Sequence, residues 1–178
     1  ESDDDLCETL DRYGIPYHRG SLNNVLERFY TFLLGQDDEI LVFRLTADNV
    51  LPDGKLLDEM EREFILSDVE ILNCVPEVSD MPYGVCAELT TAKALKDAYE
   101  NATDDIDKEH VTPYIYNHKK SKVFNSRNVR GYNNLRVTVD TFDDYVSVKS
   151  LFNDSSDVIN ESIQSLISNF RNMKFRPY

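Results

Sequence analysis

The sequence predicts an α/β sandwich, in which helices cover a mostly parallel sheet. Short apolar segments alternate with longer segments of helical periodicity, as they do where strands and helices alternate along a chain. Two of the strand segments run directly into an aspartate, Asp48 and Asp140. The 178 residues are enough to bury one hydrophobic core. We therefore expect a single domain over residues 1–178.

Segments rich in apolar and β-branched residues, bounded by polar or turn residues, predict the strands. They are residues 15–18, 39–46, 69–73, 84–89, 123–129 and 135–139. Apolar residues that recur at spacings of three and four predict the helices. These span about residues 2–13, 22–34, 53–65, 90–100, 109–117, 142–152 and 157–171. Ser2 is the expected cap of the first helix, because the acids that follow it suit the positive end of a helix dipole.

The composition excludes some classes of function. The net charge of −14 argues against binding to a nucleic-acid polymer, whose phosphates require a basic surface. A single nucleotide is still compatible with this charge, since a few arginines and a metal ion can hold it. No apolar run is long enough to cross a membrane. Cys7, Cys74 and Cys86 fit no paired pattern, so we expect reduced thiols in a cytoplasmic protein.

The strand-end acids Asp48 and Asp140 are the first candidates for a functional site. In an open α/β sheet, ligands bind beyond the carboxyl ends of the strands. Two carboxylates with room for water and phosphate oxygens suit Mg²⁺, which rarely takes an all-protein cage. Spacing alone leaves a second interpretation open, because an aspartate after a strand is commonly a turn residue or a helix cap.

Four further segments carry more specific information. They read GIPYHRGSLNNVLERFY (14–30), VFRLTADNVLPD (42–53), DKEHVTPYIYNH (107–118) and LRVTVDTFDDY (135–145). In this order, and at similar intervals, they resemble motifs of the cytidylyltransferases of spore-coat polysaccharide biosynthesis, relatives of the CMP-sugar synthetases. The resemblance covers most of residues 1–150.

This resemblance implies a Rossmann-like fold of the nucleotide-diphospho-sugar transferase type. It implies an enzyme of surface polysaccharide biosynthesis that joins a sugar to CMP from CTP and releases pyrophosphate. By position, Asp48 and Asp140 would be the catalytic residues and Mg²⁺ ligands. The expected nucleotide contacts are Arg19, Gly20 and Ser21. The expected substrate contacts are Glu88, Glu109, His110 and Arg136.

Several of these residues also have plausible structural roles. Ser21 is a candidate N-cap of the helix at 22–34. Arg44, within an apolar strand, is expected to pair with a structural acid, and for Arg136 a structural acid and a ligand anion are equally open. His110 is either a general base, since histidine titrates near neutral pH, or a residue that fixes its loop by hydrogen bonds.

The chain departs from the family pattern at three points. Asn24 and Cys86 occupy positions where the family usually has acids. The first βα unit, which carries the family's triphosphate-binding loop, has no counterpart in residues 1–20, so we expect the chain to be N-terminally incomplete. Without that unit, the sheet would expose two unpaired edges.

Two alternative functions follow from these departures. One is a catalytically inactive nucleotide- or sugar-binding module of the same fold. The other is a metal-dependent glycosyltransferase, although the DxD pair of that class is missing at the strand-end acids Asp48 and Asp140. The sequence leaves the sugar and the oligomeric state open, with a homodimer as one option.

Overall fold

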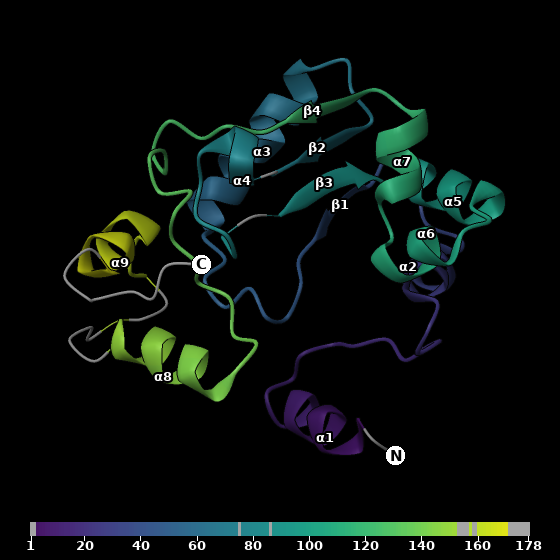
Figure 1. Ribbon diagram of the computed structural model, residues 1–178. Coiled ribbons are helices and arrows are strands. Elements are labelled where there is room, and N and C mark those ends of the chain that lie inside the picture. The colour runs from purple at the N-terminus through teal and green to yellow at the C-terminus, as the bar shows by residue number, and fades with distance from the viewer. Residues whose placement is uncertain (1–2, 75, 86, 153–156, 158–159, 171–178) are drawn as a thin grey trace. The chain divides into compact units, whose positions relative to one another are not determined.

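The computed structural model describes residues 3–74, 76–85, 87–152, 157 and 160–170. The chain divides into two compact units (Figure 1). One unit comprises Glu1–Ile40 and Ala92–His118, and the other comprises Leu41–Thr91 and Lys119–Tyr178. Among the described residues, no helix has the length and hydrophobicity that a membrane span requires.

The first unit is helical. Its elements are α1 (Asp4–Arg12), α2 (Val25–Leu33), α5 (Ala92–Asn101), α6 (Asp105–His110) and α7 (Pro113–His118). α2 packs against α5 and α6, and α7 packs against the same two helices. Leu26, Leu95 and Ile115 are fully buried there. The strand expected at 15–18 does not form, and these residues are exposed.

Two helix boundaries in this unit differ from expectation. α2 begins after Asn24, whose side chain accepts a hydrogen bond from the Glu27 N–H at 3.0 Å. Ser21 is therefore not the N-cap; instead, its hydroxyl accepts from the Asn24 N–H at 3.1 Å. The single helix expected at 109–117 is wrong, because the chain turns at Val111 and a new helix starts at Pro113. Proline suits the first position of a helix, where its missing N–H costs nothing.

The second unit contains a four-stranded sheet. Its strands are β1 (Leu41–Arg44), β2 (Ile71–Asn73), β3 (Glu88–Thr91) and β4 (Ser121–Val123), and they lie in the order β1-β3-β2-β4. β3 pairs antiparallel with both β1 and β2, and β2 pairs parallel with β4. The expected mostly parallel sheet is therefore wrong, and the sheet is mixed. Apolar patterns identify strands but do not show in which direction a strand runs in the sheet. The antiparallel orientation of β3 could therefore not be predicted from the sequence.

Two expected strands are largely absent from this sheet. Residues 124–129 continue past β4 without strand structure, and residues 135–139 form only isolated bridges, of Arg136 with Tyr83 and of Thr138 with Asn49. Val137 is nevertheless fully buried, which explains the apolar pattern. At Gly84, with φ of 99°, a Cβ would lie 2.8 Å from the backbone nitrogen of Thr138, so glycine permits this close approach.

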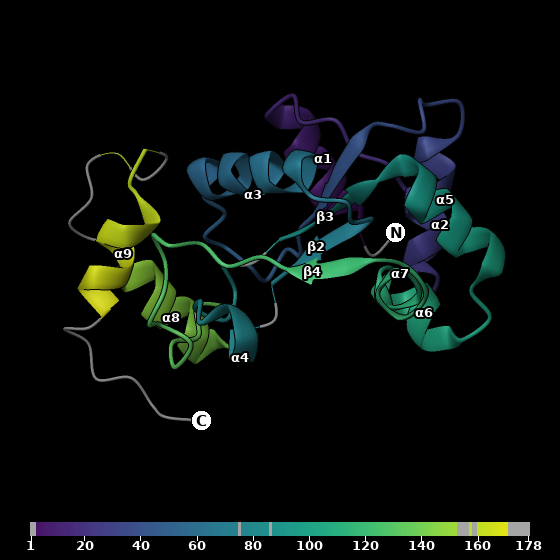
Figure 2. The same ribbon diagram turned by 90° about the horizontal axis from the view of Figure 1, so that it is seen from above.

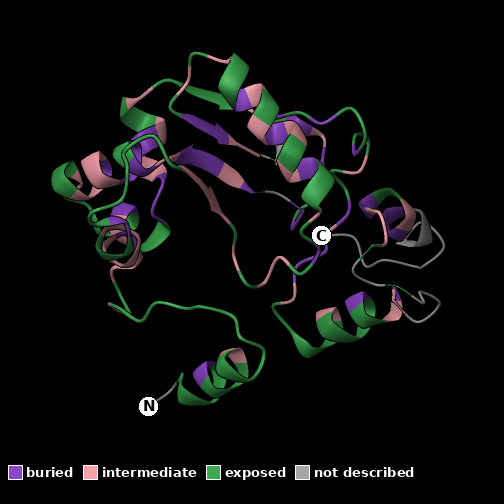
Figure 3. Ribbon diagram, turned by 180° about the vertical axis from the view of Figure 1, so that it is seen from behind, coloured by how far each residue is buried: buried purple, intermediate pink, exposed green. Residues whose placement is uncertain are grey.

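Helices and the sheet enclose one core in this unit. The helices are α3 (Gly54–Leu66), α4 (Pro76–Ser79), α8 (Phe142–Ser150) and α9 (Ile163–Phe170). α3 lies on one face of the sheet and α4 on the other side (Figure 2). The core joins Met60 of α3 and Leu89 of β3 with Val148 of α8 and Ile167 of α9. Figure 3 shows the buried parts of β2 and β3 at the centre of this unit.

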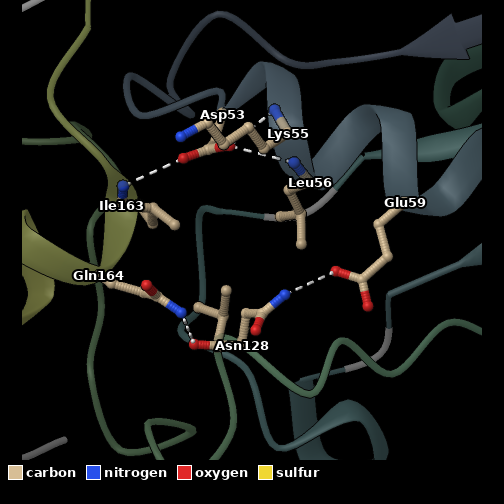
Figure 4. Close-up of a pocket in the computed structure, with 8 residues that line it drawn as sticks. Asp53, Lys55, Leu56, Glu59, Asn128, Ile163 and Gln164 are labelled. Atoms are coloured by element: carbon tan, nitrogen blue, oxygen red, sulfur yellow. Dashed lines mark hydrogen bonds between the residues drawn. The ribbon is translucent and has the colours of Figure 1, made fainter.

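Asp53 connects the starts of two helices. One carboxylate oxygen accepts the N–H groups of Lys55 and Leu56 at 2.8 and 3.0 Å, which caps α3. The other oxygen accepts the N–H of Ile163, the first residue of α9, at 3.0 Å (Figure 4). The adjacent cavity of about 200 Å³ is bordered by Glu59, which accepts from the Ser126 hydroxyl at 2.8 Å. One carboxylate thus holds together segments far apart in sequence.

Candidate functional site

Asp48 and Asp140 lie on paired segments of the second unit. The Val139 N–H donates to the backbone oxygen of Asp48 at 3.0 Å, and Asn49 and Thr138 form an antiparallel bridge. Asp48 is half-buried and Asp140 is exposed. The backbone therefore brings together the two residues that the sequence singled out, although Asp140 does not end a strand of the sheet.

Asp140 is held by its own segment. Arg136 forms an ion pair with one carboxylate oxygen, and the Thr138 hydroxyl donates to the same oxygen at 2.9 Å. The hydrogen bond from Arg136, followed by that from Thr138, lowers the pKa of Asp140 below its ordinary value. The Arg136 guanidinium also lies 4.9 Å from the centre of the Tyr83 ring, a cation–π geometry. Arg136 thus has an acid partner, and that partner is itself a candidate ligand residue.

The backbone after Asp140 is fixed by a capping box. The Thr141 hydroxyl accepts from the Asp144 N–H at 3.2 Å, and the Asp144 carboxylate accepts from the Thr141 N–H at 2.8 Å. The same carboxylate also accepts from the Asp140 N–H at 3.1 Å. These bonds start α8 immediately after the candidate ligand and restrict the backbone of Asp140.

The donor set decides which metal these residues fit. The described residues contain no group of three or more His, Cys, Asp or Glu side chains that could hold a metal ion. A closed protein cage is therefore not formed by this part of the chain. Two carboxylates on paired segments fit Mg²⁺, which commonly takes one or two carboxylates and completes its octahedron with water and phosphate oxygens.

Glu88 lies opposite Arg44 in the β1–β3 register, and the two side chains form an ion pair at 2.8 Å. Each side chain is only 19% exposed. The structural acid expected for Arg44 is thus Glu88, and that expectation is confirmed. Glu88 was expected to contact substrate, and any such contact would have to be made while it neutralises Arg44.

Replacing Glu88 by alanine should destabilise the second unit by about 1–2 kcal/mol, because a half-buried Arg44 loses its partner. The paired variant Arg44→Met/Glu88→Leu should recover most of this loss, since it leaves no buried charge. Urea unfolding of the single and paired variants measures both effects. Equal stability of Glu88→Ala and the parent chain would show that the ion pair is solvated and contributes nothing.

The expected nucleotide contacts lie in the first unit. Arg19 pairs with Asp4 of α1 at 2.7 Å and also donates to the Cys7 sulfur at 3.5 Å. Gly20 is exposed, and Ser21 is half-buried. These three residues lie in the segment without regular secondary structure that precedes α2, which begins at Val25. The strand expected before them does not form, and their predicted role as nucleotide contacts stays a prediction.

Glu109 and His110 are exposed at the end of α6. The His110 ring makes no hydrogen bond to the described part of the chain. The loop is instead fixed by its backbone, since the Thr112 N–H donates to the His110 oxygen at 2.9 Å across Val111. Val111 is fully buried with φ of 75° and ψ of −51°, a conformation that is strained for a β-branched residue. The sequence does not predict this γ-turn, because a positive φ is normally expected at glycine or asparagine and rarely at valine.

The chain resembles known proteins over most of its length. No family model matches it. An uncharacterized protein of Methanocaldococcus jannaschii is 31% identical over 169 residues, which covers 92% of this chain and 65% of that protein. The spore coat polysaccharide biosynthesis protein SpsF of Bacillus subtilis is 30% identical over 172 residues, which covers 94% of this chain and 70% of SpsF.

A solved structure shares the fold. The structure of a cytidylyltransferase from Leptospira borgpetersenii serovar Hardjo-bovis matches with a TM-score of 0.85 at 24% identity, over 96% of this chain and 71% of that one. This likeness shows the α/β fold with its mixed sheet. The chain spans about two thirds of the length of the curated relatives it matches. On its identity to SpsF over most of both sequences, the chain belongs to the family of spore coat polysaccharide biosynthesis protein SpsF.

Proposed function

We propose that this protein is a cytidylyltransferase that forms a CMP-sugar from CTP and a sugar, with release of pyrophosphate, in polysaccharide biosynthesis. The observation that carries the proposal is the pairing of the Asp48 and Asp140 segments in a fold shared with a cytidylyltransferase. In nucleotidyl transfer, the protein mainly positions the reactants and neutralises charge, and these residues suit that task.

Asp48 and Asp140 would hold Mg²⁺. When bound, the ion would neutralise phosphate charge and orient the α-phosphate for attack by the sugar hydroxyl. The capping box keeps the Asp140 backbone in place, and the hydrogen bonds from Arg136 and Thr138 that lower the pKa of Asp140 hold its carboxylate. Arg136, already stacked on Tyr83, would turn from Asp140 toward an anionic group of the substrate. Glu88, Glu109 and His110 remain proposed sugar contacts, and Arg19, Gly20 and Ser21 proposed nucleotide contacts.

Calorimetric titration of residues 1–178 with CMP and with CTP tests the nucleotide part of the proposal. We expect weak and similar affinities, because the described residues provide no glycine-rich basic loop around the β- and γ-phosphates. Mg²⁺ should improve binding only modestly. A preference for CTP of about a hundredfold, or about 2.7 kcal/mol, would show that these residues contain a triphosphate site that this account lacks.

A catalytically inactive nucleotide-binding module is the second candidate. It is favoured by the ion pair of Arg136 with Asp140, which occupies the proposed metal ligand. Release of pyrophosphate from CTP by this protein with a panel of sugars separates the two candidates. Binding of CMP without any turnover across the panel would favour the module.

A further inference from the structure

Arg28 on α2 is a half-buried cation that forms no ion pair with the described residues. Its Nε atom is buried and has no hydrogen-bond partner among the described residues. Its two Nη atoms likewise form no hydrogen bond or ion pair with that part of the chain, and they are not among the buried unpaired atoms, so solvent reaches them. In a chain with 33 acids and a net charge of −14, an unpaired arginine in this position requires an explanation.

The Arg28 side chain lies directly under the Arg19–Ser21 segment. A Cβ added to Gly20 would lie 2.7 Å from the Cγ of Arg28 and 3.6 Å from its Cδ. The absence of a side chain at Gly20 therefore allows the segment to lie across the arginine stem. Side chains of a helix also point back toward its N-terminus, which directs Arg28 toward Asn24 and the segment.

The helix itself offers Arg28 no negative partner. The residue one turn earlier, where a pairing acid would stand, is the neutral Asn24. The Asn24 side-chain oxygen is already used as the cap of α2, at 3.0 Å from the Glu27 N–H. Asp4, the acid that contacts the Arg19–Ser21 segment, is paired with Arg19. The guanidinium charge is thus not neutralised by these neighbours.

A guanidinium that has lost part of its hydration gains free energy from an anion that restores its hydrogen bonds. We propose that Arg28 is an anion-binding residue, which takes a phosphate oxygen of a nucleotide bound at the Arg19–Ser21 segment. This inference rests on the proposed function for the identity of the ligand. Asn24 then contributes to anion binding, because a neutral residue at this position leaves the Arg28 guanidinium free to bind the phosphate.

Two substitutions test the proposal in the intact chain. Arg28→Gln removes the charge, and Asn24→Asp supplies an acid four residues before Arg28 while preserving the cap, since aspartate caps helices as well as asparagine. Both should weaken CMP binding about tenfold in calorimetry, the loss expected for one charge-assisted hydrogen bond in a half-exposed site. Neither should change the affinity for cytidine, which lacks the phosphate. Arg12→Gln, an exposed arginine on α1, is the matched control and should change neither.

The outcomes are distinct. Equal loss of cytidine and CMP affinity in Arg28→Gln would overturn the proposal and show that Arg28 only supports the segment. Unchanged CMP affinity in Asn24→Asp, with normal melting temperature, would overturn it as well. Titration with inorganic phosphate tests the anion site independently of the proposed function. Phosphate binding that Arg28→Gln abolishes, in a chain that does not bind CMP, would sustain the anion site and refute the nucleotide assignment.

Discussion

Under the proposed function, Asp140→Asn is expected to reduce kcat by at least about a hundredfold, with little change in stability. Loss of a metal ligand removes charge neutralisation from the transition state, which is worth several kcal/mol. Stability should change little, because the ion pair with Arg136 is partly exposed, at 33% and 45% for the two side chains, and such pairs contribute little. Pyrophosphate release and urea unfolding, measured on the same preparation, provide the two readouts.

Asp143→Asn is the matched control, since Asp143 is an exposed acid in the first turn of α8. It should retain activity. If Asp140→Asn instead unfolds the protein, with a loss comparable to a core substitution, Asp140 acts as part of the α8 cap and the metal hypothesis loses its main residue.

Asp53→Ala is expected to have the largest effect on stability, about 2–3 kcal/mol. The substitution removes the α3 cap and leaves the N–H groups of Lys55, Leu56 and Ile163 without their acceptor. Loss of a cap costs about 1 kcal/mol, and loss of a hydrogen bond to a charged group adds a similar amount or more. The midpoint of urea unfolding should fall without a change in slope.

Two companion variants identify the cause. Asp53→Asn keeps an oxygen for the α3 cap but replaces the oxygen that accepts from Ile163, so it should lose about half as much stability. Asp58→Ala, at an exposed acid of α3, should have almost no effect. A loss below about 0.5 kcal/mol in Asp53→Ala would show that water replaces the carboxylate and that α9 is held by apolar packing alone.

The elements that the sequence predicted well are those with local signals. α1, α2 and α3 have helical periodicity and polar residues at their starts, and β1 and β2 are short apolar runs between polar residues. Their boundaries differ from the predicted ones by a few residues where a particular side chain caps the helix. At α2, for example, the N-cap is Asn24. These features depend on neighbours in the chain, which a sequence displays directly.

The features that were missed depend on partners distant in the sequence. The reversed direction of β3 and the isolated bridges of residues 135–139 follow from packing, and burial of Val137 requires no regular strand. The same applies to the candidate site. Asp48 and Asp140 were identified by their places after apolar segments, whereas the partners of Asp140 and Glu88 are visible only in three dimensions. Cys86, where the family usually has an acid, lies outside the described residues.

The order β1-β3-β2-β4 also has a consequence for synthesis of the protein. β3 lies between β1 and β2 but follows both in the chain, so neither earlier strand has its neighbour until Thr91 has been made. From Leu41 to Thr91 are 50 further residues (91 − 41), which take about 3–10 seconds at ordinary translation rates. During that interval β1 has an open edge, and β2 has one from the synthesis of Ile71–Asn73 until Thr91 is made, so each can pair with other chains. Translation speed, temperature and chaperone supply should therefore affect the yield of folded protein more than the stability of the finished sheet does.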